Sequence, residues 1–471
     1  MIYPSIIQGG MGVGVSNWVL ARAVSLAGQL GVVSGTALDV MLARRLQSGD
    51  PGGNMRLAFA NFPFPDIARR VWEQYFVEGG IPKTQPYKAV PMMTAAPSQS
   101  LLELHTLANF VEVFLAKAGH AGAVGINFLE KIQMPTLSCI FGSMLAGVDF
   151  ILMGAGIPKA IPGILDRFSK GESAKLKLEV QGAAPEDDYA TSFDPKSFCG
   201  GIAPFLKRPK FLAIISSATL ALTLARKSSG TVDGFIVEGA TAGGHNAPPR
   251  GPMQLSATGE PVYGERDTPD LKKIAEIGLP FWLAGSYGAP GKLAEAVQQG
   301  AVGIQVGTAF AFCEESGVAP PIKEQAIQSA CDGTLKVVTD PLASPTGFPF
   351  KVVQTEGSIA SPVVYTQRAR VCDLGYLRMP YRKPDGTLGY RCPAEPQTSY
   401  LHKGGDEASI CGRKCVCNGL VSTVGLGQVV AGGKIEPPLL TAGDDIVNLS
   451  RFFKPGTKTY TARDVIDALL G

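Results

Sequence analysis

The sequence predicts an α/β protein of the (β/α)8 barrel class, on three observations. Apolar, β-branched runs of strand length recur along the chain, each run ends in a turn of small residues, and helical patterns separate the runs. Eight parallel strands surrounded by helices form a closed barrel, with the active site at the carboxyl ends of the strands. The eight expected strands are residues 5–8, 31–34, 123–127, 150–153, 211–215, 234–237, 281–284 and 302–306.

Helix signals support this alternation. Ser16 and Asn17 can cap a helix over residues 18–26, which Gly28 ends, and residues 270–277 form a second helix. The alternative architecture is a doubly wound open sheet. However, the first glycine-rich loop, residues 9–14, does not have the dinucleotide-binding spacing, and no acidic residue follows the second strand at once. The pattern therefore favours the barrel.

Three segments add to the barrel, which we place at residues 1–317. A long insertion after the second strand, about 50–119, is rich in Pro, Phe and Tyr, and we expect it to cap the barrel mouth or to form a dimer contact. A second insertion, about 170–209, contains an alternating run that predicts an exposed strand. Residues 318–471 lose the regular alternation, carry several cysteines and form a C-terminal extension.

Composition narrows the possible functions. The 471 residues are 45% apolar and carry a net charge of +3 from 43 basic and 40 acidic side chains. This balance argues against nucleic acid and against an anionic membrane as partners, and favours a small or acylated substrate. No targeting segment or membrane-spanning run is recognisable. Because the nine cysteines are scattered, we expect a reducing compartment and a cytoplasmic location. We also expect a homo-oligomer.

The sixth expected strand leads into the most informative loop of the chain. Gly243 and Gly244 follow this strand and deliver His245, the predicted catalytic residue. Because glycine has no Cβ, a flat ligand can approach the backbone closely. A histidine with a near-neutral pKa can exchange a proton with a carbon next to an electron-withdrawing group. Glu238 closes the strand, where it can orient His245, bind a cofactor hydroxyl or cap the turn.

Glycine-rich turns also follow the last two expected strands. Gly285, Ser286 and Gly288 come after the seventh strand, and Gly307 and Thr308 come after the eighth. In barrels of this class, the backbone N–H groups of these two loops bind phosphate without a lysine or an arginine. The alternative is that the glycines only permit tight turns.

The loop after the first strand offers a third glycine-rich backbone. Gly9, Gly10, Met11 and Gly12 form a surface against which a planar ring can lie. Asn127, at the end of the third strand, can direct its amide toward the same mouth and pair with the edge of a heterocycle. An internal hydrogen bond that caps the turn is the alternative role for Asn127.

The extension contains candidate metal ligands. Cys411, Cys415 and Cys417 lie close together in the sequence, and Cys372 and Cys392 precede them. Four thiolates, with Cys392, Cys411, Cys415 and Cys417 as the candidates, can ligate zinc or an iron–sulfur cluster. The spacing is not the paired C-x-x-C of strong metal motifs, so simple buried thiols are the alternative.

Together, five segments resemble the nitronate monooxygenase (2-nitropropane dioxygenase-like) family and, close to it, the FMN-dependent enoyl-acyl-carrier-protein reductases. The resemblance covers roughly residues 6–312. The segments that carry it are residues 7–12, 125–128, 153–156, 238–245 and 305–308.

This resemblance implies a barrel that binds FMN. It places the phosphate on the loops at 285–288 and 307–308, and the ring near residues 8–12 and Asn127. It also implies cofactor contacts from Gly243, Gly244 and Gln305, and it aligns His245 with the catalytic histidine of the family.

The resemblance leaves two reactions open. A nitronate monooxygenase oxidises a nitronate or nitroalkane with O2. A reductase takes electrons from NAD(P)H and reduces an enoyl thioester, with an acyl carrier protein of a fatty acid or polyketide synthase as partner. The long insertion, the extension and residues 246–251 depart from the family pattern and leave the substrate open. A further alternative is a non-catalytic scaffold with a metal-binding interaction module.

Overall fold

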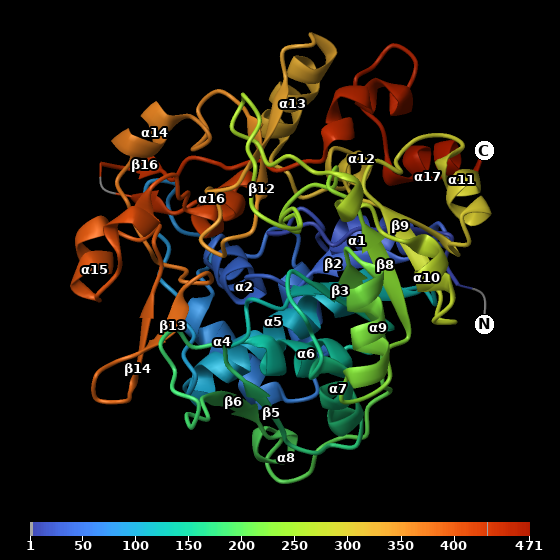
Figure 1. Cartoon of the computed structure of the whole chain (residues 1–471). Helices are drawn as coiled ribbons and strands as arrows, with labels where there is room; N and C mark the ends of the chain where they lie inside the picture. Colours follow the sequence, from blue (N-terminus) through green and yellow to red (C-terminus); the bar gives the residue numbers. More distant parts are fainter. Residues whose placement is uncertain (1–2, 431) are drawn as a thin grey trace.

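The computed structural model describes residues 3–430 and 432–471, and a parallel eight-stranded barrel lies at its centre (Figure 1). Neighbouring strands follow the order β1-β10-β9-β8-β7-β4-β3-β2. The backbone N–H of Gln8 donates to the carbonyl of Leu30 at 3.0 Å, and the N–H of Leu30 donates to Ile6 at 3.1 Å, so β1 and β2 close the barrel. The strands are β1 (Ile6–Gln8), β2 (Gly31–Ser34), β3 (Val124–Leu129), β4 (Phe150–Gly154), β7 (Lys210–Ile215), β8 (Gly234–Glu238), β9 (Phe281–Ala284) and β10 (Gly303–Val306).

All eight strands coincide with the expected runs to within two residues at each end, which confirms the predicted fold class. The interior of the barrel is filled by apolar side chains; Ile7, Leu152 and Trp282 are fully buried in one cluster. Helices surround the strands: α1 (Trp18–Leu26), α5 (Gln99–Lys117), α6 (Thr136–Leu145), α7 (Ile161–Ser169), α9 (Ala218–Lys227), α10 (Leu271–Ala275) and α11 (Lys292–Gln298).

The first expected helix is confirmed, including its cap, because the Asn17 side chain accepts a hydrogen bond from the Leu20 N–H at 3.0 Å. The second is shorter than expected. Helix α10 begins at Leu271 because the Asp270 carboxylate accepts from the N–H of Lys273 and caps the helix there. No helix in the described part of the chain is both long and apolar enough to cross a membrane.

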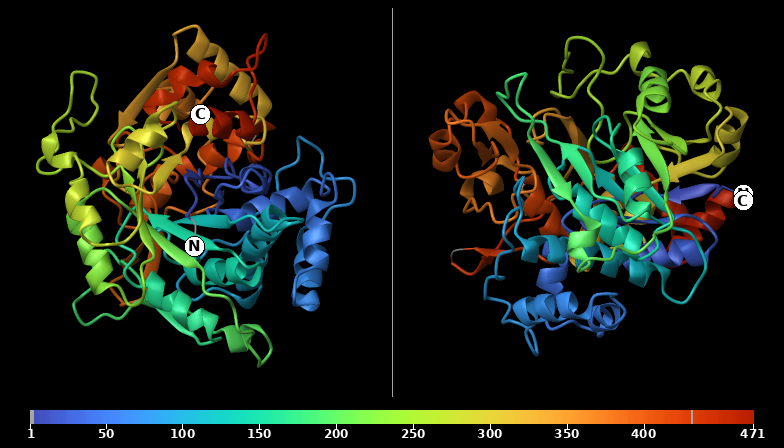
Figure 2. Two further views of the ribbon diagram at one scale, coloured as in Figure 1. Left: turned by 90° about the vertical axis from the view of Figure 1, so that its right-hand side faces the viewer. Right: turned by 90° about the horizontal axis from the view of Figure 1, so that it is seen from below.

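The insertion after β2 contributes helices to the outside of the barrel. Helix α5 lies against α1, α2 (Leu38–Gln47) and α6, so it occupies the position of the barrel helix between β2 and β3. Helices α3 (Asn54–Ala60) and α4 (Pro65–Tyr75) pack on α5 at the side of the molecule (Figure 2). The second insertion forms a hairpin in which Lys175 and Lys177 are exposed, as the alternation predicts. Its elements are β5 (Ala174–Lys177), β6 (Ala190–Phe193) and α8 (Pro195–Phe198).

The C-terminal extension lies over one end of the barrel and then returns to its outer wall. Helix α17 (Ala462–Leu470) packs against α1 and α11 and completes the ring of helices around the barrel between them (Figures 1 and 2). The other elements after β9 are α12 (Thr308–Ala311), α13 (Pro320–Cys331), β11 (Lys336–Asp340), β12 (Phe350–Gln354), α14 (Pro362–Gln367), β13 (Met379–Arg382), β14 (Leu388–Arg391), α15 (Gln397–His402), α16 (Val416–Thr423), β15 (Val429–Val430) and β16 (Lys434–Ile435). The 3-10 helices are η1 (Glu265–Asp267), η2 (Glu407–Ile410) and η3 (Asp444–Phe452).

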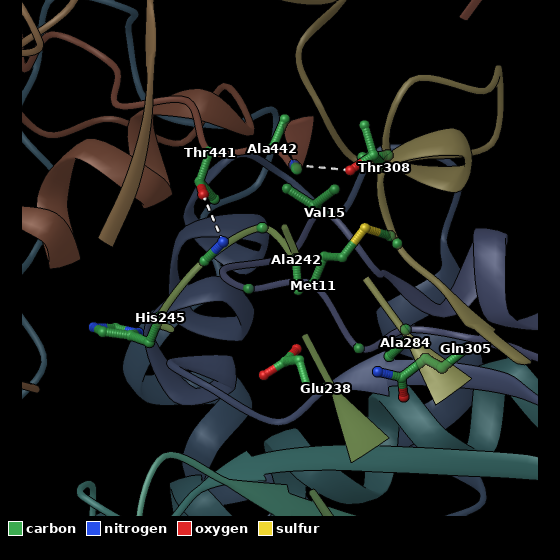
Figure 3. Close-up of a pocket in the computed structure, with 18 of the residues that line it drawn as sticks. Met11, Val15, Glu238, Ala242, His245, Ala284, Gln305, Thr308, Thr441 and Ala442 are labelled. Carbon is green, nitrogen blue, oxygen red and sulfur yellow. Dashed lines mark hydrogen bonds between the residues drawn. The ribbon is translucent and has the colours of Figure 1, made fainter. Parts of the chain in front are cut away.

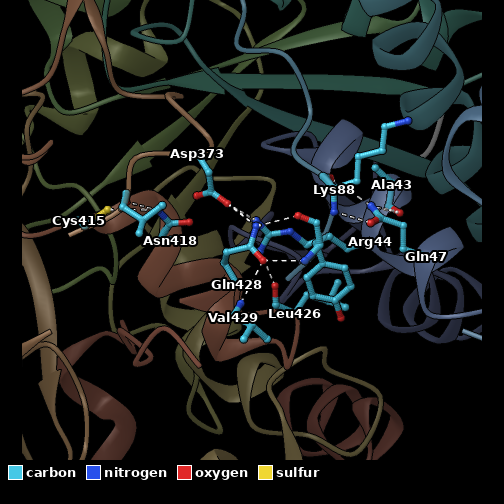
Figure 4. Close-up of polar contacts among 12 residues, drawn as sticks. Ala43, Arg44, Gln47, Lys88, Asp373, Cys415, Asn418, Leu426, Gln428 and Val429 are labelled. Atoms are coloured by element: carbon cyan, nitrogen blue, oxygen red, sulfur yellow. Dashed lines mark hydrogen bonds and ion pairs between the residues drawn. The ribbon is translucent and has the colours of Figure 1, made fainter. Parts of the chain in front are cut away.

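A buried polar network joins the extension to helix α2 and to the insertion after β2 (Figure 4). Arg44 on α2 donates to Asp373 at 2.9 Å, in an ion pair that is almost fully buried. Gln428 donates to the same carboxylate at 2.9 Å and accepts from the N–H of Tyr87 at 2.8 Å. Breaking one member of such a network leaves the others desolvated without a partner, so these contacts hold the two parts in one arrangement.

Candidate active site

A cavity of about 210 Å³ opens at the carboxyl ends of the barrel strands (Figure 3). His245 and all of the residues predicted to contact a cofactor line this one cavity. The predicted cofactor residues are Gly9, Gly10, Met11, Gly12, Asn127, Gly243, Gly244, Gly285, Ser286, Gly288, Gln305, Gly307 and Thr308. Loops that are far apart in the sequence meet here because parallel strands bring all their carboxyl ends to the same face of a barrel.

The Asn127 side chain lies so close to the backbone of residue 10 that only glycine fits there. A Cβ at Gly10 would lie 2.2 Å from the Cβ of Asn127, which is closer than any real contact. The Asn127 amide nitrogen donates to the carbonyl of Gly10 at 3.3 Å, so the expected internal hydrogen bond is present. The Asn127 Oδ1 and Gln305 Oε1 atoms, however, are buried and have no hydrogen-bond partner within the described residues. Both side chains therefore retain an acceptor for a donor group in the cavity.

Gln8 plays a different part from the one the resemblance implies. Its side chain donates to the Ser16 hydroxyl at 2.8 Å and accepts from the Val32 N–H at 2.9 Å. The residue is fully buried and is not among those that line the cavity. Gln8 thus joins β1 to β2 inside the wall, and the floor at this point is formed by Gly9 to Gly12.

The extension covers the two loops that are predicted to bind phosphate. The N–H of Gly443 donates to the Thr308 hydroxyl at 2.8 Å, and the Arg451 side chain donates to the carbonyl of Gly288 at 3.1 Å. Asp445 also lines the cavity; burial raises the pKa of its carboxyl group, and the Arg451 guanidinium opposes that rise. Gly285 has a φ of +94°, so the loop needs glycine there to turn back over the strand end.

His245 is held by the extension as well. Its Nε2 atom lies 2.7 Å from the hydroxyl of Ser344, which is completely buried, and its ring contacts that of Phe350 at 4.7 Å between centroids. The Lys351 N–H donates to the carbonyl of Gly244 at 2.9 Å, which fixes the loop to β12. Burial lowers the pKa of His245 to about 4, so the imidazole is neutral at neutral pH.

The ring of His245 turns away from Glu238, which reaches into the cavity from the end of β8 (Figure 3). The Glu238 carboxylate makes no hydrogen bond within the described residues, so it neither orients His245 nor caps the turn. Burial raises the pKa of Glu238 to about 7. The cavity therefore contains a neutral imidazole and a carboxyl group that titrates near neutrality.

Glu238→Gln is expected to make the flavin-free protein more stable above pH 7 and to leave its stability unchanged at pH 4. The folded-state pKa of about 7 exceeds the ordinary value of 4.5, so the wild-type protein loses stability as the pH rises between these values. One pKa unit corresponds to about 1.4 kcal/mol, which limits the difference to about 3 kcal/mol. Urea unfolding at pH 4 and pH 8.5 measures the difference, and equal curves at pH 8.5 would contradict the raised pKa of Glu238.

The residues that the extension contributes to the cavity do not stand out in the sequence. Phe350, Leu420, Thr441, Ala442 and Asp445 all line it. The Thr441 hydroxyl accepts from the N–H of Gly244 at 3.0 Å (Figure 3). None of these residues follows a strand and a glycine-rich turn, which was the pattern that located the others.

Comparison with known proteins finds a match over part of the chain. A sequence model of the nitronate monooxygenase family matches residues 206–345, which include β7 to β10, His245 and both predicted phosphate loops. The (3aS,4S,5R,7aS)-5-hydroxy-7a-methyl-1-oxo-octahydro-1H-indene-4-carboxyl-CoA dehydrogenase of Mycobacterium tuberculosis is 30% identical over 145 residues. That alignment spans 31% of this chain and 36% of the relative, about a third of its length.

Solved structures are similar at low sequence identity. FabK from Thermotoga maritima is 16% identical with a TM-score of 0.45, and the match covers 100% of this chain and 92% of that one. Nitroalkane oxidase from Streptomyces ansochromogenes is 14% identical with a TM-score of 0.43, covering 99% and 94%. The enoyl reductase domain of MlnA from Bacillus amyloliquefaciens is 13% identical with a TM-score of 0.47, covering 98% and 92%.

The family match extends over the strands and loops that build one wall of the cavity, and it confirms the resemblance found in the sequence. Residues 206–345 of this chain are thus similar to the nitronate monooxygenase family.

Proposed function

We propose that the protein is an FMN-dependent oxidoreductase that oxidises a nitronate or nitroalkane substrate with O2 and uses His245 as its acid/base. The observation that carries this proposal is the cavity itself, where every loop of the predicted flavin site meets. The buried acceptors Asn127 Oδ1 and Gln305 Oε1 suit the edge of a flavin ring, which offers both donors and acceptors.

The residues present fit FMN. Gly9 to Gly12 form a floor without side chains at three of four positions, which leaves room for a planar ring. The loops at 285–288 and 307–308 provide the backbone N–H groups for the phosphate. When bound, FMN supplies the redox chemistry, and the protein supplies position and proton transfer.

His245 is prepared to accept a proton. Its lowered pKa keeps the imidazole neutral, and the hydrogen bond between Nε2 and Ser344 restrains the ring. Within the described residues Nδ1 has no hydrogen-bond partner, so this nitrogen remains available for proton exchange with a substrate carbon. Ser344 acts as a positioning residue, because it sets the orientation of the ring without lining the cavity.

The second candidate is an NAD(P)H-dependent enoyl-thioester reductase that serves a fatty acid or polyketide synthase through an acyl carrier protein. One observation favours it: the segment between His245 and α10 exposes the apolar side chains of Met253, Leu255 and Val262, which suit an acyl chain. The mycobacterial relative is named for a substrate that is also a thioester, a carboxyl-CoA.

An anaerobic absorbance titration of the purified protein tests the proposal. We expect an alkyl nitronate to bleach the bound flavin and NADH or NADPH to leave it oxidised. Bleaching by the nicotinamide alone would establish the reductase in its place. A protein that shows no flavin band and carries metal would instead be the scaffold with an interaction module.

A further inference from the structure

A second large cavity lies beside the proposed flavin site, where the second insertion meets the barrel. Its volume is about 410 Å³. The hairpin of β5 and β6 packs on α6 and α7 (Figure 1), and the cavity opens between this hairpin and the N-terminal end of α7. None of the residues predicted to contact a cofactor lines it. The cavity is therefore separate from the proposed flavin site.

The alternating run of the second insertion forms one wall of this cavity. Along β5, Lys175 and Lys177 are exposed, whereas Leu176 is buried. Leu178 continues the alternation, and its N–H donates to the carbonyl of Tyr189 at 2.9 Å. Leu176 and Leu178 both line the cavity. The insertion thus presents an apolar face to this space.

The opposite wall is apolar as well. Met153 at the end of β4 and Ile161 at the start of α7 are buried, and both line the cavity. Ile157 lies between them in the chain, lines the cavity and is 52% exposed. An isoleucine that is exposed beside an apolar cavity gains free energy when an apolar ligand covers it.

The polar groups of the lining are paired with one another or with water. The Gln133 side chain donates to Glu130 Oε1 at 3.0 Å and accepts from the backbone N–H of Glu179 at 2.7 Å. Two lysines that line the cavity, Lys159 and Lys177, are exposed to solvent. The interior therefore favours an apolar ligand over a charged one.

Only two touching loops separate this cavity from the flavin cavity. Leu129 lines the flavin cavity, and the next residue, Glu130, lines the second one. Gly154 and Ala155 likewise line the flavin cavity, whereas Ile157 lines the second. The N–H of Glu130 donates to the carbonyl of Gly154 at 2.9 Å, which joins the two loops. Because three residues span at most about 11 Å, the Cα atoms of Gly154 and Ile157 lie within that distance.

We propose that the second cavity binds the alkyl chain of a substrate whose reacting group lies in the flavin cavity. The inference rests on the proposed function for the position of the reacting group, and it names the substrate class as long-chain nitronates or nitroalkanes. The chain crosses the loop after β4 at Ile157 and then lies between Met153 and Leu176. Each methylene group that leaves water contributes about fourfold in affinity. Short-chain compounds end within the flavin cavity and gain nothing from the second one.

Calorimetric titration of the purified, flavin-loaded protein with an uncharged alcohol tests the inference. We expect 1-decanol to bind and 1-butanol, whose chain is short, to give no measurable heat at the same concentration. Ile157→Asn should weaken the binding of 1-decanol about fivefold to tenfold, because it removes an apolar contact at the half-exposed side chain. Ile202→Asn is the matched control, since Ile202 is 86% exposed and does not line the cavity; this variant should bind like the wild type.

Turnover provides the second measurement. With alkyl nitronates from butyl to decyl, kcat/KM of the wild type should rise with chain length through a falling KM, because the chain does not touch the reacting atoms. The rise should be smaller in Ile157→Asn and in Ala160→Phe, which narrows the cavity from the start of α7. Both variants should turn over the butyl compound at the wild-type rate.

Failure of 1-decanol to bind the wild type would overturn the inference. Equal binding by the wild type, Ile157→Asn and Ala160→Phe would overturn it as well, because the chain would then lie elsewhere. The expected binding pattern in a protein that does not oxidise nitronates would refute the proposed function and still support the cavity as a chain-binding site, since calorimetry needs no turnover. A substitution at the half-exposed Ile157 is also compatible with folding.

Discussion

Replacing His245 by alanine is expected to leave FMN bound and to lower kcat by about 10²-fold to 10⁴-fold, the usual contribution of a general acid/base. The reason is geometric. The loop backbone at Gly244 is fixed by Thr441 and Lys351, so it keeps its shape without the imidazole. Flavin absorbance of the purified variant reports binding, and anaerobic stopped-flow reduction by the substrate reports the chemical step.

Ser344→Ala provides the matched comparison for His245→Ala. It retains the imidazole and removes the hydrogen bond to Nε2. If the orientation of the His245 ring matters as we propose, Ser344→Ala keeps FMN and loses part of kcat. Ser344→Thr retains the hydroxyl, so it should recover the lost kcat. Turnover at the wild-type rate in His245→Ala would show that another group exchanges the proton, and Glu238, which reaches into the same cavity, would be the first to examine.

Gly307→Asp is expected to expel FMN. The position lies in the loop proposed to bind phosphate, and a carboxylate there would face the phosphate at close range. Two like charges about 4 Å apart repel by about 4 kcal/mol near a protein surface, which corresponds to roughly a thousandfold in Kd. Flavin content after gel filtration, and titration of the flavin-free protein with FMN, measure the loss.

Gly307→Ala is the control for this change. A Cβ at position 307 meets only the Met11 side chain, at 3.6 Å, and the φ of −105° is open to any L-residue. The alanine variant should therefore bind FMN normally. The comparison distinguishes the effect of the negative charge in Gly307→Asp from the effect of adding a side chain. Normal flavin content in Gly307→Asp would place the phosphate elsewhere, and equal losses in both variants would point to a steric effect.

The barrel was predictable from the sequence because its signals are local. Each strand is a short apolar run followed by small residues, and both the strand and its loop lie within about ten positions of each other along the chain. Parallel strands then bring their loops to one face without further information, so the cavity residues from Gly9 to Thr308 could be named in advance.

The rest of the site depends on contacts that no local pattern encodes. Ser344 meets His245 across 99 positions of sequence, and Thr441 meets Gly244 across 197. The cysteines show the same limit: spacing grouped Cys411 with Cys415 and Cys417, but Cys411 is exposed, whereas Cys372 and Cys392 lie beside the other two around one small cavity. Within the described residues, no group of these side chains is placed to hold a metal ion. Contacts between residues that are far apart in the sequence leave no local pattern by which they could be predicted.

Helix α17 has a consequence for how this chain is made. Its buried face of Val465, Ile466 and Leu469 fills the ring of helices beside α1, which is synthesised long before residues 462–470. During synthesis the seam next to α1 therefore stays open until residues 462–470 emerge, and apolar surface is exposed for that time. Pairing the two ends of the chain costs loop-closure entropy and slows folding. Until residues 462–470 are synthesised, this exposed apolar seam makes the nascent chain prone to aggregation.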